Sequence, residues 1–487
     1  MTAVLAFDLG AESGRAIRGE LREEQLTLAE ITRFPNLPVR ATDGSLRWDI
    51  EALWAHIRGA LDGLDERPTS IGVDAWGCDY GLIGADGALL ERPYHYRDAR
   101  TDGVMTRVVQ ALGREAIYET TGIQFLPFNT LFQLCAACDQ HPEVMQAASA
   151  LLTIPDLLNY WLTGRAVAEL TNATTTQMID ARSRAWAPTL LEQLHLPTRV
   201  LPDLAEPGSV LGVVHRTAHI ALAGTPVVLP ACHDTGSAFA AVRTGKHTAF
   251  LSSGTWSLLG TEMPAPTITP AARDLNFTNE GGVNGTTRLL KNIAGLWLLQ
   301  ACRREWNGKA GSLEYDALLA SAVDAQPFRT LFDPDADAFL HPARMTAAID
   351  HYADTTAQPA PRSPAEYTRA VLESLALKYR LVLDSLEDVC GGRFSAIRVV
   401  GGGSRNRLLN QFTADATGRV VLAGPAEATA LGNVSVQLVA MGAVPSLDRA
   451  REIVDNSFPA ERFEPRVPDA WDAQLARFKT LVELTCA

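Results

Sequence analysis

The sequence predicts an α/β fold built from two similar domains, and three observations carry this prediction. The first is length, because 487 residues are more than twice the usual size of one domain. The second is a pattern of strand, glycine turn and strand that occurs twice, with Gly10 and Gly254 lying 244 residues apart, half of the chain. The third is an alternation of strands and helices after residue 363. We expect duplication, with a boundary near 242–247 that separates domains 1–243 and 244–487.

The elements of the first half follow from hydrophobic patterning. An apolar run is followed by a glycine turn at 10–14 and by a run that alternates between apolar and polar residues. A third run completes an antiparallel meander, and Trp48 and Asp49 then introduce a pattern with helical period. The predicted elements are strands at 4–9, 16–21, 26–34 and 70–74 and a helix from 49 to about 64.

The second half repeats this opening at 248–260, with a turn at 252–255. Ser363, Pro364 and Glu366 have the spacing of a capping box, which predicts the start of a long amphipathic helix that glycines end at 391–392. The remaining predicted elements are a strand at 396–400, a glycine turn at 401–403, a helix at 404–417, a strand at 419–423 and a helix from 426 that contains Gly432. A strand, a glycine-rich turn and a helix in this order are typical of phosphate binding.

Composition and charge exclude several classes of function. The chain has 43 Lys and Arg against 56 Asp and Glu, and its net charge of −13 repels nucleic acid and anionic membranes. Its seven scattered cysteines indicate a reducing compartment, and the single CxxC at 135 and 138 lacks the second pair of ligands that zinc needs. No signal-peptide pattern or membrane-spanning run occurs. We expect a soluble cytoplasmic protein without nucleic-acid or membrane partners, either a monomer or a small homo-oligomer.

The familiar nucleotide motifs do not occur in this sequence. It has no P-loop, and the glycines at 401–403 do not continue into the dinucleotide-binding pattern. What remains is one glycine hairpin in each half, with Ala11 and Ser13 at the first tip and Thr255 at the second. Backbone N–H and hydroxyl groups at such tips can bind phosphate oxygens. Each hairpin alone is also compatible with an ordinary turn, but the pair suggests two domains that hold one polyphosphate.

Two carboxylates are candidates for chemistry. Asp8 ends an apolar strand, where it either caps its own turn or faces magnesium, and the adjacent glycine turn favours magnesium. Asp234 follows an apolar run, and here His233 could be a core residue and Asp234 the N-cap of a helix at 235–242. Phosphoryl transfer needs a carboxylate that orients the acceptor hydroxyl and takes its proton. We assign that role to Asp234.

Longer strings of residues carry a resemblance to a known family. The generic features lie at 8–15, 233–235, 252–256 and 401–404, and more specific strings lie at 74–79, 122–131, 277–282 and 290–300. Through them nearly the whole chain resembles the FGGY carbohydrate kinases, which are members of the actin-like ATPase superfamily. The resemblance implies an α/β protein of two ribonuclease-H-like domains with a cleft between them, which uses ATP and Mg²⁺. The specific strings resemble the branch of the family that phosphorylates the C1 hydroxyl of L-rhamnulose in L-rhamnose catabolism.

Carried over by position, the resemblance implies a set of site residues. Asp234 is the base, and Asp8 faces magnesium through water. The residues expected to contact ATP are Ala11, Glu12, Ser13, Gly14, Arg15, Thr255, Gln300 and Gly402. Those expected to line the sugar site are Gly77, His233, Asp234, Thr235 and Asn292. Domain 1–243 would then bind the sugar and supply the base and the first hairpin, and domain 244–487 would supply the second hairpin, the adenosine site and a C-terminal helix.

Two alternatives stay open at this point. A kinase for another ketose, such as fuculose or xylulose, would share the generic residues, because selection among sugars depends on the shape of a polar pocket. A noncatalytic sugar-sensing protein or an actin-like ATPase is the alternative from a different class. That alternative predicts damage at Asp234 or at the hairpins, and the sequence shows none.

Overall fold

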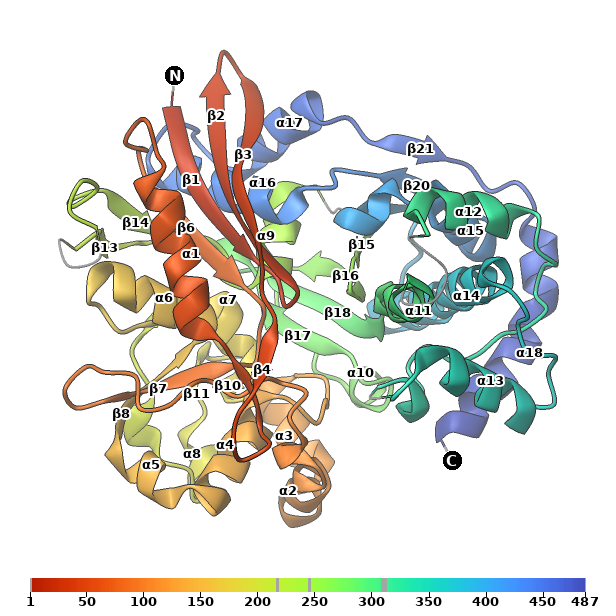
Figure 1. Ribbon diagram of the computed structural model, residues 1–487, viewed down its shortest axis with the longest axis horizontal. Coiled ribbons are helices and arrows are strands. Elements are labelled where there is room, and N and C mark those ends of the chain that lie inside the picture. Colours follow the sequence, from red (N-terminus) through yellow and green to blue (C-terminus); the bar gives the residue numbers. More distant parts are fainter. Residues whose placement is uncertain (1, 216–218, 244–246, 308–312, 341, 487) are drawn as a thin grey trace. The chain divides into compact units, whose positions relative to one another are not determined.

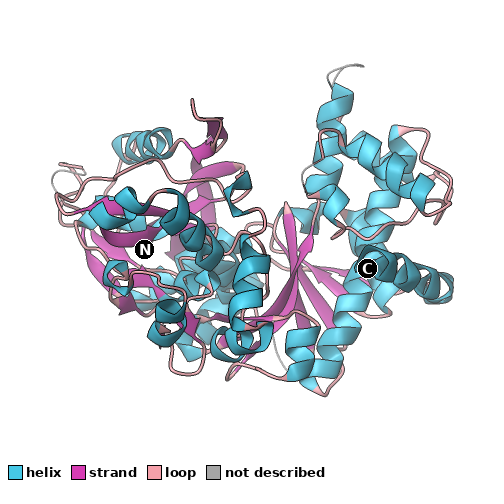
Figure 2. Ribbon diagram, turned by 90° about the horizontal axis from the view of Figure 1, so that it is seen from below, coloured by secondary structure: helices cyan, strands magenta, loops and turns pink. Residues whose placement is uncertain are grey.

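The computed structural model describes residues 2–215, 219–243, 247–307, 313–340 and 342–486. The chain divides into two compact units, and both contain strands and helices (Figure 2). The first unit comprises Met1–Arg243, Glu262–Leu289 and Ala428–Phe458, and the second comprises Thr244–Thr261, Leu290–Glu427 and Pro459–Ala487. The domain limits 1–243 and 244–487 stay a prediction, and part of the predicted boundary, 244–246, lies outside the described residues.

The sheet of the first unit has the strand order β13-β14-β6-β1-β2-β3. β1 pairs antiparallel with β2, β2 pairs antiparallel with β3, and β1 pairs parallel with β6. The predicted meander and the strand that follows it are therefore confirmed. The strands are β1 (Thr2–Leu9), β2 (Ser13–Arg22), β3 (Gln25–Pro35), β6 (Ile71–Ala75), β13 (Val210–Val213) and β14 (Pro226–Val228).

Helices cover both faces of this sheet. On one face, α1 (Ile50–Asp62) and α6 (Ile154–Thr163) pack their apolar residues against Leu5, Phe7 and Val73, and together these form the main core. On the other face lies α16 (Ala428–Ala440), drawn in blue in Figure 1, whose Gln437 donates a hydrogen bond to the carbonyl of Leu5. A helix from a distant part of the chain thus covers the second face of the first sheet.

α16 also packs closely against α9 (Asp234–Ala241). The contact requires glycine, because a Cβ added at Gly432 would lie 1.7 Å from the carbonyl oxygen of Ser237. A Cβ added at Gly19 of β2 would likewise lie 2.6 Å from Cγ1 of Val434 in α16. Small residues therefore fix the position of α9, the helix that begins at Asp234.

An insertion between β6 and β14, together with further short elements, completes the first unit. Its strands are β4 (Pro38–Arg40), β5 (Leu46–Trp48), β7 (Tyr80–Gly84), β8 (Ala148–Thr153), β9 (Ala168–Glu169), β10 (Ile179–Asp180), β11 (Ala185–Trp186), β12 (Leu204–Ala205) and β17 (Thr278–Gly281). Its remaining helices are α2 (Val104–Leu112), α3 (Arg114–Thr121), α4 (Thr130–Gln140), α5 (Pro142–Ala147), α7 (Leu170–Ala173), α8 (Pro188–Gln193), α10 (Pro270–Asp274) and α17 (Leu447–Ser457). The CxxC at 135 and 138 lies on α4.

The second unit repeats the strand order of the first. Its strands lie in the order β18-β16-β15-β19-β20-β21, where β15 pairs antiparallel with β16 and parallel with β19. The corresponding relations in the first unit are those of β1 with β2 and with β6. The strands are β15 (Thr248–Ser253), β16 (Trp256–Met263), β18 (Thr287–Ala294), β19 (Ala396–Val400), β20 (Val420–Ala423) and β21 (Glu461–Phe463). This shared order supports the predicted duplication.

The helices of the second unit test the predicted boundaries. Ser363 caps α14 and accepts a hydrogen bond from the backbone N–H of Glu366, as the capping box predicts. The helix predicted at 404–417 starts later, because Asn406 is the true N-cap and accepts from the N–H of Leu409. A short 3-10 turn, η6 (Gly402–Arg405), precedes it. The helices are α11 (Trp297–Asn307), α12 (Tyr315–Val323), α13 (Met345–Thr355), α14 (Pro364–Cys390), α15 (Arg407–Thr417) and α18 (Pro468–Cys486).

None of the described helices combines the length and the hydropathy that crossing a bilayer requires.

Candidate active site

Three parallel strands of the first unit bring the candidate residues to one edge of the sheet. Asp8 ends β1 opposite Asp74 of β6, and β14 runs parallel to β6 on its other side. Beyond β14, the backbone N–H of Ala75 donates to the carbonyl of Cys232 at 2.9 Å, and Ala75 forms a bridge with His233. Asp8 and the segment 233–235 therefore meet at the carboxyl ends of the strands, where open α/β sheets commonly bind ligands.

Asp234 lies at the start of α9, but it is not the N-cap that one interpretation of the sequence made it. The N-cap is His233, and Asp234 is the first residue of the helix. The carboxylate turns back on its own neighbour, since Oδ1 accepts from the backbone N–H of Thr235 at 2.5 Å and from its hydroxyl at 3.0 Å. The Asp234 side chain is 31% exposed, so it can still be reached by a ligand.

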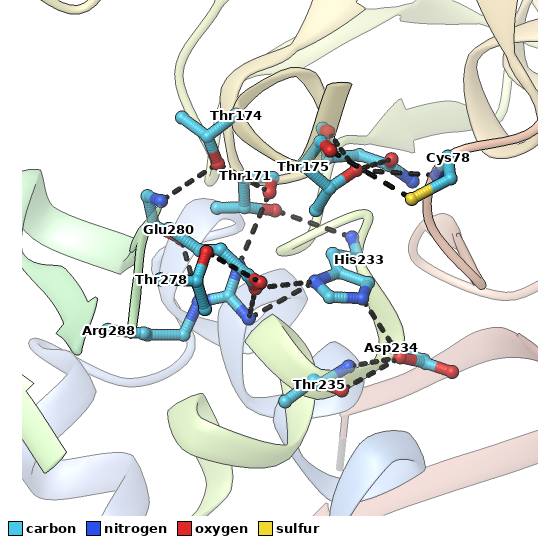
Figure 3. Close-up of polar contacts among 12 residues, drawn as sticks. Cys78, Thr171, Thr174, Thr175, His233, Asp234, Thr235, Thr278, Glu280 and Arg288 are labelled. Atoms are coloured by element: carbon cyan, nitrogen blue, oxygen red, sulfur yellow. Dashed lines mark hydrogen bonds and ion pairs between the residues drawn. The ribbon is translucent and has the colours of Figure 1, made fainter. Parts of the chain in front are cut away.

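His233 is buried against charged groups that the sequence did not assign to the site (Figure 3). Its Nδ1 lies 3.1 Å from Nη1 of Arg288 and 3.3 Å from Oε2 of Glu280, and its Nε2 lies 3.4 Å from Oδ1 of Asp234. Arg288 is fully buried and forms an ion pair with Glu280 at 3.1 Å. An arginine next to Leu289 and Leu290 in an apolar strand was the signal that could have revealed this buried pair.

A second buried carboxylate holds the segment before His233 in place. Glu169 accepts hydrogen bonds from the N–H groups of Cys232 and Thr171 and from the Thr171 hydroxyl. Burial raises the pKa of Glu169 to about 7, against an ordinary value of 4.5. The His233 N–H in turn donates to Oγ1 of Thr171 at 3.4 Å. The sequence reasoning missed Glu169 and Thr171, which fix the backbone of the candidate site.

Asp74 is the third acidic residue at this edge. It is completely buried, Asn433 of α16 donates to its Oδ2 at 2.6 Å, and its Oδ1 has no hydrogen-bond partner among the described residues. Burial raises the pKa of Asp74 well above its ordinary value, and the negative charges of Asp8 and Asp234 raise it further. Asp74 is therefore the carboxyl group most disposed to hold a proton, whereas Asp8 is paired with Arg15.

Gly77 follows β6 and lies against the insertion. A Cβ at this position would approach Oγ1 of Thr175 to 2.9 Å, so the loop passes too closely for any other residue. The next residue, Cys78, has φ 73° and donates from its backbone N–H to the same hydroxyl. Trp76 is anchored by Asp79, which accepts from its indole N–H at 3.0 Å. The loop at Gly77 is thus held on both sides.

The first glycine hairpin joins β1 and β2. Gly10 donates to the carbonyl of Ser13, and Asn36 closes the turn by bonding the carbonyls of Gly10 and Glu12. Ala11 and Ser13 are half-buried and Glu12 is exposed. Gly14 is buried under Phe34, whose ring would lie 2.2 Å from an added Cβ. The packing of Gly14 against Phe34 therefore fixes the hairpin, and the residues at its tip, Ala11, Glu12 and Ser13, stay partly or fully exposed.

The remaining candidate residues lie in the second unit. Thr255 is at the tip of the β15–β16 hairpin, where its carbonyl accepts from Trp297 at the start of α11. Gln300 lies one turn further along α11, and its Oε1 is buried without a hydrogen-bond partner among the described residues. Gly402 begins η6, and no atom lies within 4 Å of a Cβ added there. Asn292 lies half-buried on β18.

The glycine turn beside Gly402 packs against the hairpin strand β15. Added Cβ atoms would lie 3.0 Å from the carbonyl of Ser253 at Gly401 and 2.1 Å from its hydroxyl at Gly403. Gly401 also has φ 81°, a conformation that favours glycine. Two of the three glycines are thus required by packing, and Gly402 is the one that leaves its backbone open to a ligand.

Among the described residues, no three His, Cys, Asp or Glu side chains converge in a way that could hold a metal ion.

Comparison with protein families gives matches over both halves of the chain. The model of the FGGY family of carbohydrate kinases, N-terminal domain, matches residues 3–241, and the model of the C-terminal domain of the same family matches residues 249–441. A rhamnulokinase of Bacteroides thetaiotaomicron is 44% identical over 486 residues, which are 98% of this chain and 99% of the relative. A rhamnulokinase of Oceanobacillus iheyensis is 40% identical over 93% of this chain and 96% of the relative.

Solved structures share the fold at much lower identity. The xylulose kinase from Rhodospirillum rubrum is 20% identical with a TM-score of 0.78, over 99% of this chain and 98% of that chain. The Plasmodium falciparum glycerol kinase with ADP is 17% identical with a TM-score of 0.78, over 100% of this chain and 99% of that chain. These likenesses confirm the predicted two-domain α/β fold.

Proposed function

Because the chain belongs to the FGGY family of carbohydrate kinases, we propose that it is an ATP-dependent kinase that phosphorylates L-rhamnulose at the C1 hydroxyl. The products are L-rhamnulose 1-phosphate and ADP, and the reaction belongs to L-rhamnose catabolism. One observation carries the choice of sugar. Rhamnulokinases from distant bacteria are 40–44% identical to this chain over 93–99% of its length.

Asp234 is the base in this proposal. Its side chain is 31% exposed, whereas Asp8 and Asp74 at the same sheet edge are buried. A positioned carboxylate can orient the C1 hydroxyl and accept its proton. The C1 oxygen forms its bond to the γ-phosphorus while the bond from this phosphorus to the departing ADP oxygen breaks, and the hydroxyl proton passes to Asp234.

The sugar site in this proposal comprises Gly77, His233, Asp234, Thr235 and Asn292. Support comes from the first unit, where the segment 233–235 is fixed by Glu169 and Thr171 at the carboxyl ends of the strands. The tightly packed loop at Gly77 follows the neighbouring strand β6. Buried hydroxyl and amide groups of this kind recognise a sugar by its hydrogen-bonding pattern.

The ATP site in this proposal draws on both glycine hairpins. Ala11, Glu12, Ser13, Gly14 and Arg15 contact the phosphates from the first, and Thr255 contacts them from the second. Gln300 and Gly402 complete the nucleotide site. The unpartnered Oε1 of Gln300 and the open backbone at Gly402 are features that a polar ligand would fill.

Mg²⁺ would neutralise phosphate charge when ATP is bound. Asp8 is the residue that would face it, through water. The carboxylate of Asp8 lies at the end of β1 directly before the first hairpin, and Arg15 balances its charge. A single carboxylate with its cationic partner fits an ion held mainly by phosphates and water.

The proposal also assigns roles to the two predicted domains. Domain 1–243 would bind the sugar, and domain 244–487 would bind adenosine and carry the C-terminal helix. Closure of the predicted cleft over both substrates would keep out water, which is itself a phosphoryl acceptor. A cytoplasmic location is part of the same proposal, and the cysteines with described side chains are free thiols, as a reducing compartment would keep them.

The test replaces Asp234 by asparagine and assays transfer with a panel of ketoses. Asp234→Asn is expected to keep ATP binding and to lose about 10²- to 10⁴-fold in kcat on L-rhamnulose. Asp139→Asn is the control, because this carboxylate forms only an exposed ion pair with Arg107. Near-normal turnover of Asp234→Asn would exclude it as the base. A higher kcat/KM on L-fuculose or D-xylulose would refute the choice of sugar, and ATP hydrolysis indifferent to every sugar would favour an ATPase.

A further inference from the structure

The ring of His233 touches three charged groups, and these define which of its nitrogens carries a proton. Nδ1 faces the guanidinium of Arg288 at 3.1 Å and the carboxylate of Glu280 at 3.3 Å. Nε2 faces the carboxylate of Asp234 at 3.4 Å. In Figure 3 the ring lies between the Glu280–Arg288 pair on one side and Asp234 on the other. A proton on Nδ1 and a proton on Nε2 would thus serve different partners.

The contact with Arg288 requires a lone pair on Nδ1. A guanidinium has five N–H donors and no acceptor, so Nη1 can bond to Nδ1 only by donating. The competing arrangement, in which Nδ1–H donates to Glu280, uses the longer of the two contacts. Moreover, Oε2 of Glu280 accepts no well-oriented hydrogen bond from the part of the chain that the structure describes. When one ring nitrogen of a neutral histidine accepts, the other carries the hydrogen, which here is Nε2.

Arg288 itself is held in a single position. Its Nε donates to the carbonyl of Gly281 at 2.8 Å, its Nη2 donates to the carbonyl of Thr171 at 3.3 Å, and its side chain is fully buried. The first turn of α9 packs directly against it, since a Cβ at Gly236 would lie 3.4 Å from Cζ. The guanidinium therefore cannot swing away from His233.

Glu280 compensates the positive charge of the buried Arg288. Burial has the largest influence on the pKa of Glu280 and tends to raise it, but the charge of Arg288 at 3.1 Å, together with the contacts to His233 and Thr278, lowers this pKa overall, so the carboxylate stays ionised. A buried cation without such a partner would be strongly destabilising. Glu280 thus keeps Arg288 in place behind the ring, with Nη1 lying 3.1 Å from both Oε2 of Glu280 and Nδ1 of His233.

The consequence reaches Asp234, whose two oxygens become different. Oδ1 faces Nε2–H of His233 and also accepts from the N–H and the hydroxyl of Thr235. Among the described residues, both hydrogen bonds to the Asp234 carboxylate end on Oδ1, and the side chain is 31% exposed. The N–H and hydroxyl of Thr235 bond to Oδ1, Nε2 of His233 lies 3.4 Å from the same oxygen, and Oδ2 remains open to a substrate.

We propose that Arg288, held by Glu280, fixes His233 as the Nε2–H tautomer, so that His233 anchors Oδ1 of Asp234 and Oδ2 is the atom that accepts the substrate proton. Arg288 and Glu280 are thus positioning residues that act through His233. The proposal rests on the function assigned to Asp234 above, but the tautomer itself can be measured without substrate.

The first test reads the tautomer by ¹⁵N NMR of the full chain labelled at histidine. The chain has ten histidines, and the His233 signals are those that disappear in His233→Gln. We expect a pyridine-type Nδ1 and a pyrrole-type Nε2 at neutral pH. A pyrrole-type Nδ1, or a ring protonated on both nitrogens, would overturn the proposal. This outcome is independent of the identity of the sugar and of the base.

The second test separates positioning from a merely structural role. The double variant Arg288→Met/Glu280→Gln removes both charges together, so that neither is left buried alone. We expect its His233 to lose the fixed tautomer and kcat to fall about 10- to 100-fold, with KM for ATP unchanged. If the double variant folds and His233 keeps the Nε2–H tautomer, Arg288 does not select it and the proposal fails. If the variant does not fold, the wild-type spectrum decides alone.

The third test compares two uncharged replacements of His233. Glutamine can place an amide N–H where Nε2–H was, whereas asparagine reaches only as far as Nδ1. We expect His233→Gln to keep kcat within about 10-fold of the wild type and His233→Asn to lose about 100-fold. Equal losses in both variants would contradict an anchoring donor at Nε2. If Asp234→Asn stays active while the tautomer is as expected, the proposed base is wrong and the positioning of His233 still stands.

Discussion

The close contact between α9 and α16 yields a prediction whose sign can be worked out from the structure. In Gly432→Ala the new Cβ would lie 1.7 Å from the carbonyl oxygen of Ser237, far inside the 3.0 Å that real Cβ contacts respect. The two helices must therefore move apart by roughly 1 Å or more. Overpacking of this kind costs about 1–3 kcal/mol, and the better helix propensity of alanine returns only about 1 kcal/mol.

We therefore expect Gly432→Ala to destabilise the protein by up to about 2 kcal/mol, toward the upper end because the contact is backbone and cannot rotate away. The matched control is Gly59→Ala in α1, a helical glycine with no atom within 4 Å of the added Cβ. That variant should gain up to about 1 kcal/mol. The two substitutions are chemically identical, so opposite shifts in the melting temperature isolate the contact.

The same displacement should reach the candidate active site. α9 starts at Asp234, one turn before Ser237, and a shift of about 1 Å in a catalytic group can cost on the order of 100-fold in rate. Kinase assays on L-rhamnulose should show a lower kcat for Gly432→Ala and an unchanged kcat for Gly59→Ala. A Gly432→Ala protein with wild-type stability and turnover would refute the reasoning.

Two further predictions concern a buried carboxyl group and the glycine turn at 401–403. Burial raises the pKa of Asp156 from 3.8 to about 8. The carboxyl group of Asp156 therefore keeps its proton in the native state up to about pH 8, whereas in the unfolded chain it loses the proton above about pH 4. The free energy of unfolding should consequently fall as pH rises from about 4 to 8. Asp156→Asn, which mimics the protonated group, should flatten this dependence in urea unfolding at pH 5, 6.5 and 8, and an equally steep slope would contradict it. Gly403→Ala should lower the melting temperature, because its Cβ would lie 2.1 Å from the Ser253 hydroxyl. In Gly402→Ala the free energy of unfolding should stay within about 0.5 kcal/mol of the wild type, and ATP binding should be weaker. Equal melting temperatures for both would contradict the packing argument.

The fold could be predicted largely because its signals are local. The apolar alternation of β1 and β2, the capping box at Ser363 and the glycine hairpins depend on residues close in sequence. Boundaries were less certain where two capping residues compete. Ser404 and Asn406 both favour an N-cap, and only the packing of the glycine turn on Ser253 decides for Asn406.

The candidate site could be predicted only as far as its recognisable motif extends. The sequence indicated Asp8 and Asp234, and their shared sheet edge follows from the parallel strands β1, β6 and β14. It did not indicate that Arg288 and Glu280 lie behind His233. Their pairing depends on side chains that only the fold brings together, and no periodicity in the sequence encodes such a contact. The alternative interpretation of Asp234 as an N-cap does not apply, because His233 is the N-cap and the carboxylate of Asp234 bonds to Thr235.

The order of the chain through the first unit has a consequence for how the protein is made. The sheet formed by β1, β2 and β6 is available once the first 243 residues have been synthesised, but α16, which covers one of its faces, belongs to residues 428–440. At 5–20 residues per second, the ribosome needs roughly 10 to 40 s to add the intervening chain. During that interval the face that Gln437 will cover is open to other nascent chains. Exposed surface of this kind favours aggregation, so the first sheet depends on residues made late in synthesis for its protection.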